Sequence, residues 1–105
     1  MHLSARRYEN VTNPRELGRH VNETFIPLIS AVPGFIAYYF TDAGNGTMVS
    51  TSIFKDKTGA EESNRVAAEW VKKNPNVLPT ATRVTTGEVL GHQVSRELLE
   101  QKVSR

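Results

Sequence analysis

The stretch from Val32 to Lys55, VPGFIAYYFTDAGNGTMVSTSIFK, decides the fold of this chain. Two runs rich in aromatic and β-branched residues stand on either side of the dipeptide Asn45-Gly46. Such runs favour β-strands, and Asn-Gly between them is the strongest short signal for a hairpin, because a type I′ turn requires positive φ at both central residues. The sequence therefore predicts an antiparallel hairpin here.

Pairing across this turn assigns the side chains of the hairpin to two faces. One face is expected to carry Ile36, Tyr38, Phe40, Val49, Thr51 and Ile53, and the other Phe35, Ala37, Tyr39, Ser50, Ser52 and Phe54. Both faces contain aromatic or aliphatic side chains, so neither is typical of a solvent-exposed surface. Helices can cover one face. We expect a partner subunit, in a homodimer, to cover the other.

The segment before the hairpin predicts a strand and a helix. The strand is expected over residues 3–9. The helix begins at Asn13-Pro14, where Asn can cap and Pro suits the first helical position. Pro27 predicts a kink or an end near Phe25, because proline lacks the backbone donor. The apolar stripe of this helix is expected to contain Leu17, Val21, Phe25, Leu28 and Ile29.

The segment after the hairpin predicts a second helix and a fourth strand. The helix begins at Asp56-Lys57-Thr58, with Thr58 and Glu61 as a capping box, and it ends at Asn74-Pro75. The strand covers residues 82–90, with Gly87 as a bulge or close approach. Residues 1–91 are expected to form one domain. Residues 92–105 form a tail with a short helix over 94–103, capped by Ser95.

This order of elements predicts a ferredoxin-like α+β fold, in which both helices cover one face of a four-stranded antiparallel sheet. The order, together with Pro33-Gly34-Phe35 and the segment from Ser52 to Asp56, resembles the antibiotic biosynthesis monooxygenase group of dimeric α+β barrels over about residues 3–90. The resemblance implies a homodimer with a ligand cavity between sheet and helices. Members of the group include oxygenases of aromatic polyketides that need no metal or flavin, haem-degrading enzymes, and proteins without an assigned activity.

Composition excludes several classes of function. The chain has 105 residues, no cysteine and a net charge of +2, so disulfides, thiol catalysis and thiolate metal sites are excluded. Basic residues are scattered without a stripe, which argues against a nucleic-acid partner. There is no signal-peptide-like segment and no run of about 18 apolar residues. We therefore expect a cytoplasmic protein with no membrane partner.

The candidate ligand-binding residues lie on the second helix and the hairpin. Trp70 is either the wall of a cavity or the core anchor of a helix poor in large residues. Asn64, on the inward side of that helix, either bonds to a strand or water or faces a polar ligand. The resemblance adds tyrosines near the cavity, here Tyr38 and Tyr39, which with Trp70 and Asn64 would stabilise a substrate anion. Ser50 and Ser52, with Ala37, leave space for either a cavity or close packing.

Histidines do not indicate a metal site. His20, on the flank of the first helix, is either an acid or base near neutral pH or an ordinary, partly exposed side chain. No two histidines are spaced as ligands on a helix. Haem-degrading relatives place their iron ligand on the second helix, and no histidine occurs here between Lys57 and Asn74. We expect neither a metal nor another cofactor.

Two functions follow from the sequence. The first is a dimer that binds a small apolar or aromatic molecule between sheet and helices. The alternative is a cofactor-independent monooxygenase of the antibiotic biosynthesis type that acts on an aromatic substrate. We favour the first, because no acid–base pair or nucleophile can be identified.

Overall fold

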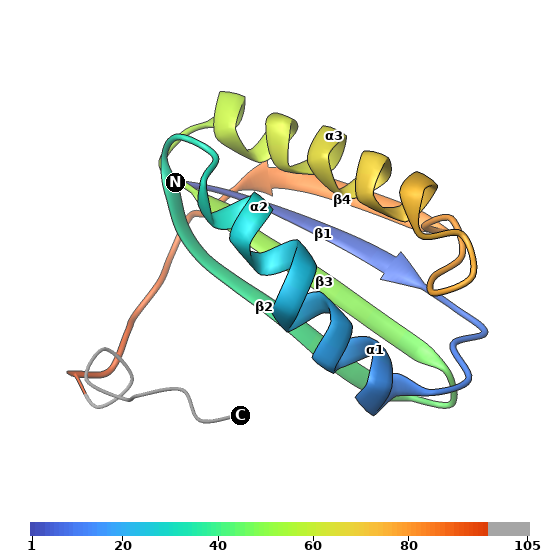
Figure 1. The fold of residues 1–105 in the computed structure, drawn as a ribbon. Helices are drawn as coiled ribbons and strands as arrows, with labels where there is room; N and C mark the ends of the chain where they lie inside the picture. Colours follow the sequence, from blue (N-terminus) through green and yellow to red (C-terminus); the bar gives the residue numbers. More distant parts are fainter. Residues whose placement is uncertain (97–105) are drawn as a thin grey trace.

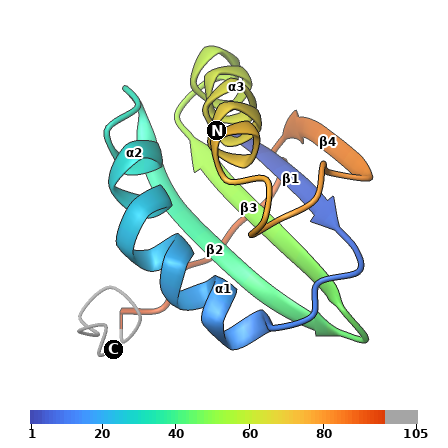
Figure 2. The ribbon, with the colours of Figure 1, turned by 45° about the vertical axis from the view of Figure 1, so that its right-hand side comes forward.

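The fold is ferredoxin-like, as the order of elements predicted (Figure 1). The computed structural model describes residues 1–96. The sheet has the strand order β2-β3-β1-β4, and every neighbouring pair is antiparallel. All helices lie on one face of this sheet (Figure 2). The elements are β1 (His2–Tyr8), α1 (Pro14–His20), η1 (Val21–Phe25), α2 (Ile26–Ser30), β2 (Phe35–Gly44), β3 (Thr47–Phe54), α3 (Lys57–Lys73) and β4 (Arg83–Glu88).

The first helix begins as predicted but does not end near Phe25. Asn13 caps α1, because its side-chain oxygen accepts the backbone N–H of Glu16. The segment η1 is a π-helix whose last turn is closed by the N–H of Ile26 on the carbonyl of Val21. Pro27 then stands in the first turn of α2, directly after the π-helix, and the chain remains helical through it. The helix therefore continues to Ser30.

The apolar stripe of this helix is narrower than predicted. Leu28 is 51% exposed, whereas the buried positions recur every fourth residue along the three segments. This spacing of four continues from η1 into α2, so the inward position there is Ile29 and Leu28 lies on the flank. These buried positions are Leu17, Val21, Phe25 and Ile29.

The hairpin turn is confirmed, but the predicted assignment of faces was wrong. Asn45 and Gly46 have φ angles of 54° and 80°, as a type I′ turn requires. The pairing shifts by one residue between Asp42 and Gly44, and again between Phe35 and Ala37. Such bulges move every side chain between them to the opposite face. The helix-covered face of the hairpin therefore carries Phe35, Tyr38, Phe40, Met48, Ser50, Ser52 and Phe54, and the open face carries Ala37, Tyr39, Thr41, Val49, Thr51 and Ile53.

The second helix keeps its predicted inward face but uses another cap. Asp56 accepts the backbone N–H of Gly59 at 3.1 Å, so the capping box expected from Thr58 is not used. The predicted bulge at Gly87 was also wrong, because Gly87 pairs with Leu3 in an unbroken register. Most of the helix expected over residues 94–103 lies outside the described residues. The inward face of α3 includes Gly59, Ala60, Ser63, Ala67 and Trp70.

A single apolar core fills the space between the helices and the sheet. Its largest members come from four elements, with Tyr8 on β1, Phe25 on η1, Phe54 on β3 and Trp70 on α3. Phe25 and Trp70 meet edge to face at 5.5 Å between ring centroids. Within residues 1–96, no helix has the length and apolar character needed to cross a membrane.

Candidate functional site

A buried arginine, Arg6, occupies the centre of the helix-covered face of the sheet. Alternation along β1 turns Ser4, Arg6 and Tyr8 toward the helices, and the Arg6 side chain lies under α3 with only 2% of the residue exposed. Its Nη2 donates to Ser50 Oγ at 3.0 Å and to Ser52 Oγ at 2.6 Å. The two serines on β3 are small enough to leave room for the guanidinium and polar enough to hydrogen-bond it.

The other end of the guanidinium contacts the helix. Arg6 Nη1 donates to Asn64 Oδ1 at 2.8 Å and to Ser63 Oγ at 3.3 Å. Four neutral oxygens therefore surround a cation. Among the described residues, no carboxylate forms an ion pair with Arg6. Burial lowers the pKa of Arg6 from its ordinary value, since the charged form is poorly solvated there.

Asn64 connects this cation to the edge strand. Its Oδ1 also accepts from Ser4 Oγ, and its Nδ2 donates to Thr86 Oγ1 on β4 at 3.0 Å. The Ser4 and Thr86 hydroxyls lie 3.0 Å apart. This network fixes the orientation of the amide, because its oxygen receives two donors and its nitrogen meets a hydroxyl. Asn64 therefore bonds to two strands, β1 and β4, which is one of the two sequence interpretations.

A groove with a volume of about 580 Å³ opens beside this network, between α3, β4 and the loop that joins them. Asn64 and Arg6 contribute its polar part. Its apolar residues include Val71 on α3, Leu78 in the loop and Val84 on β4, which is 52% exposed. The full lining is Arg6, Tyr8, Asn64, Ala68, Val71, Lys72, Pro75, Leu78, Pro79, Thr80, Ala81 and Val84.

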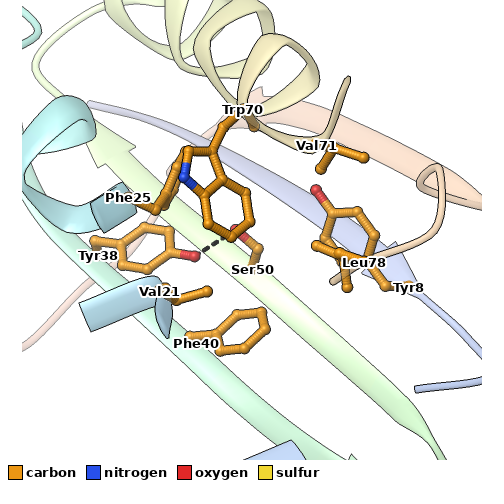
Figure 3. A pocket seen from close by; sticks show the side chains of 10 residues that line it. Tyr8, Val21, Phe25, Tyr38, Phe40, Ser50, Trp70, Val71 and Leu78 are labelled. Carbon is orange, nitrogen blue, oxygen red and sulfur yellow. Dashed lines mark hydrogen bonds between the residues drawn. The ribbon is translucent and has the colours of Figure 1, made fainter. Parts of the chain in front are cut away.

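The space beside Trp70 is almost filled (Figure 3). Its volume is about 10 Å³, which is no more than one water requires. The Tyr38 hydroxyl points to Ser50 Oγ at 2.7 Å across this space, and Trp70 donates from Nε1 to Thr24 Oγ1 at 3.1 Å. Burial is the main cause that raises the pKa of Tyr38 to about 12. Trp70 and Tyr38 are therefore core residues with satisfied polar atoms.

The structure separates the residues predicted to form one site. Tyr39 lies on the opposite face of the sheet and is 47% exposed. His20 lies beside Trp70, with its Nε2 3.4 Å from Asn74 Oδ1, and it does not line the groove. Ser50 and Ser52 accept the hydrogen bonds of Arg6 Nη2 from the sheet side. Of the predicted residues, Asn64 alone is found in the lining of the groove.

A second hollow, of about 690 Å³, lies between α1 and β2 but lacks a buried polar group. Its charged residues are exposed, and Arg19 there already pairs with Glu16 and Glu23. No group of three or more potential metal ligands occurs within residues 1–96. The groove beside Arg6 is therefore the better candidate for a ligand site.

Sequence reasoning missed Arg6 and Tyr8. In the sequence, Arg6 is one of the scattered basic residues, which are typical of a solvated surface. The available signal was alternation: in a strand, Ser4 and Tyr8 share a face with Arg6, and the other face carries Leu3 and Ala5. Nothing in the sequence, however, shows that this more polar face is the one that the helices cover.

Comparisons with known proteins agree with the fold. No protein-family model matches the chain, and no curated protein sequence matches it significantly. Solved structures do match. MupZ from Pseudomonas fluorescens superposes with a TM-score of 0.65 and 18% identity over 81% of this chain, which spans 65% of MupZ, just under two thirds of its length.

Two other matches cover nearly whole chains. A monooxygenase from the gene ActVA-Orf6 of Streptomyces coelicolor, in complex with nanaomycin D, has a TM-score of 0.65 and 13% identity over 90% of this chain and 91% of that one. A dimeric ferredoxin-like protein from an uncultured marine organism has a TM-score of 0.63 and 14% identity over 90% and 98%. Further matches are described as candidate antibiotic biosynthesis monooxygenases. At these identities the likeness shows the fold, which is the fold of the group that the sequence resembles.

Proposed function

We propose that this protein binds a small aromatic molecule in the groove between α3 and β4. The observation that carries the proposal is the groove itself, which combines apolar walls at Val71 and Leu78 with the Arg6–Asn64 network. Its volume of about 580 Å³ lies in the range of small-molecule sites, which are typically apolar with a few fixed polar groups.

Calorimetry with two naphthalene probes, 2-naphthoate and 2-naphthamide, tests this proposal. Ala68 is exposed on α3 and lines the groove, so Ala68→Phe should fill part of it and weaken binding at least about tenfold. Glu61→Phe places the same side chain on the same helix outside the groove and should leave binding unchanged. If neither probe binds, or if Ala68→Phe has no effect, the groove is not the site.

We further propose that the protein is a homodimer through the open face of the sheet. Support comes from the side chains of this face, since Tyr39 is 47% exposed and Leu3, Val49 and Ile53 are only partly buried. Contiguous apolar surface of this kind is typical of interfaces. The match to a protein described as dimeric points the same way.

Light scattering tests the dimer. The wild-type protein should have twice the monomer mass of 11.7 kDa. Tyr39→Glu places a charge on the open face and should give monomers, whereas Leu28→Glu, an equally exposed position on the helical side, should not. A wild-type mass of 11.7 kDa at high protein concentration would contradict this proposal.

A second candidate is a cofactor-independent monooxygenase. The match to a monooxygenase in complex with a small molecule favours it, as does a groove whose polar residues, Arg6 and Asn64, would stabilise an enolate. An anthrone is a suitable probe: one O2 converts its methylene to a ketone and releases one water. Oxygen uptake no faster than in buffer or with the Asn64→Ala variant would leave binding as the function.

A further inference from the structure

We propose that the ligand of this groove carries a carboxylate and that Arg6 recognises it. This inference rests on the proposed binding function and specifies the chemical class of the ligand. It begins from the charge balance of the site. Arg6 remains positively charged in nearly every protein environment, and here the residue is 98% buried with only hydroxyl and amide oxygens as partners.

A buried charge without a counter-ion is costly, and proteins normally pair it. None of the carboxylates within residues 1–96 lies in ion-pair distance of Arg6. The groove adds a second cation rather than an anion, since its charged lining residues are Arg6 and Lys72. Within residues 1–96 the positive charge of the site is therefore unbalanced, and an anionic ligand would balance it.

The hydrogen bonding of the guanidinium is also incomplete. Both terminal nitrogens have oxygen partners, but the buried Nε has none. Burial raises the pKa of the nearby Tyr8 hydroxyl, and the positive charge of Arg6 partly opposes this increase. The guanidinium is already oriented by Ser50, Ser52 and Asn64, and its Nε–H is the donor left to bind a carboxylate oxygen.

The rest of the groove explains why the acid should be aromatic or otherwise bulky. Val71, Leu78 and Val84 supply apolar surface on three sides of the same hollow. Burying a flat hydrocarbon there is favourable in proportion to its area. A small inorganic anion would satisfy the charge but leave this surface in water, so an aromatic carboxylate fits both parts of the lining.

The test compares 2-naphthoate with 2-naphthamide, which have the same ring system and nearly the same shape but differ in charge. Calorimetry at fixed ionic strength should show naphthoate binding to the wild-type protein about tenfold to a hundredfold more tightly, since a bond between charged groups is stronger than its neutral counterpart. Arg6→Met should abolish the preference, so that the two probes bind this variant with equal affinity. Arg65→Met removes an exposed arginine from the outer surface of α3 and should keep the preference.

The possible outcomes separate this inference from the proposed function. Equal binding of the two probes would overturn the carboxylate inference and leave the groove as a site for aromatic molecules. Binding of neither probe would overturn both. A preference for naphthoate that persists in Arg6→Met would exclude Arg6 as its cause. Should Arg6→Met fail to fold, Arg6→Lys keeps the charge and loses the Nε–H donor. A preference that is reduced but present supports the inference, whereas an undiminished one opposes it.

Discussion

Arg6 on the second strand from the edge and Asn64 in the middle of α3 are joined by a hydrogen bond of 2.8 Å, although 58 residues separate them in the chain. The bond brings a charged donor and a neutral acceptor together beneath the helix. It connects the sheet to the helix through polar atoms. We therefore expect the stability of the protein and the proposed ligand binding to depend on the same few side chains.

Ser52→Ala should destabilise the protein by about 1–3 kcal/mol, because it removes an acceptor from a buried charged donor. Ser52 is fully buried and receives the 2.6 Å bond from Arg6 Nη2. Urea unfolding measures the loss. Ser30→Ala, at an exposed serine near the end of α2, should change stability by less than about 0.5 kcal/mol. Equal losses of unfolding free energy in the two variants would show that the hydrogen bond from Arg6 to Ser52 does not stabilise the fold.

Thr24→Val should cost about 1 kcal/mol, since it leaves the Trp70 indole N–H without its acceptor. Trp70→Ala should cost about 3–5 kcal/mol, because it empties a packed region of the core. Both values come from chemical unfolding followed by circular dichroism, since the second variant lacks the tryptophan. A Trp70→Ala cost below that of Thr24→Val would contradict the role of Trp70 as a core anchor.

Stability should fall above pH 10. Below the ordinary pKa of tyrosine, Tyr38 is protonated in both the folded and the unfolded chain and the free energy of unfolding does not depend on it. Between pH 10 and about 12 the unfolded chain loses this proton while the folded protein keeps it, because burial raises the pKa of Tyr38 to about 12. The loss should be about 1.4 kcal/mol per pH unit in this window.

Tyr38→Phe should reduce this slope, and the remainder should include Tyr8, whose pKa is also raised by burial. Denaturant unfolding at half-unit steps from pH 9 to 12 supplies the measurement. If wild type and Tyr38→Phe lose stability in parallel, the Tyr38 hydroxyl is not buried as described.

Two helical glycines should respond oppositely to alanine. A Cβ on Gly59 would lie 2.6 Å from the Phe54 ring, so Gly59→Ala should destabilise the protein despite the better helix propensity of alanine. A Cβ on Gly18 meets nothing within 4 Å, so Gly18→Ala should stabilise by about 0.5–1 kcal/mol. Thermal unfolding compares the two. A gain at Gly59 would mean that Phe54 moves aside without cost.

The order of elements and most boundaries could be predicted from the sequence because they depend on local signals. Two dipeptides act through their own backbone and side chains. As predicted, Asn13-Pro14 starts a helix and Asn45-Gly46 forms the hairpin turn. Pro27 predicted a kink or an end near Phe25; the helix does not end there, and the π-helix that finishes at Phe25 leaves no local pattern in the sequence.

The candidate site could be predicted only in part. Asn64 could be recognised as an amide on the inward face of a helix. The burial of Arg6 could not be predicted, because it depends on Ser50 and Ser52, which follow Arg6 by 44 and 46 positions in the chain. Tyr39 was placed in the site because the resemblance implies tyrosines near the cavity, and the bulges in β2, which decide the face of each tyrosine, were not foreseen. A register shift of one residue depends on packing across the sheet rather than on the two strands alone.

The bulge between Asp42 and Gly44 has a consequence for how mutations act on this chain. It is the reason that Tyr38, and not Tyr39, is turned toward Phe25, whose ring it meets at 5.4 Å. With two tyrosines in succession, the strand offers an aromatic side chain to whichever face the register selects. Deleting Ala43 would remove this bulge and turn Tyr39 toward the helices and Tyr38 toward the open face. The loss of one amino acid near the turn would therefore change the side chains of both the interior and the open face of the sheet.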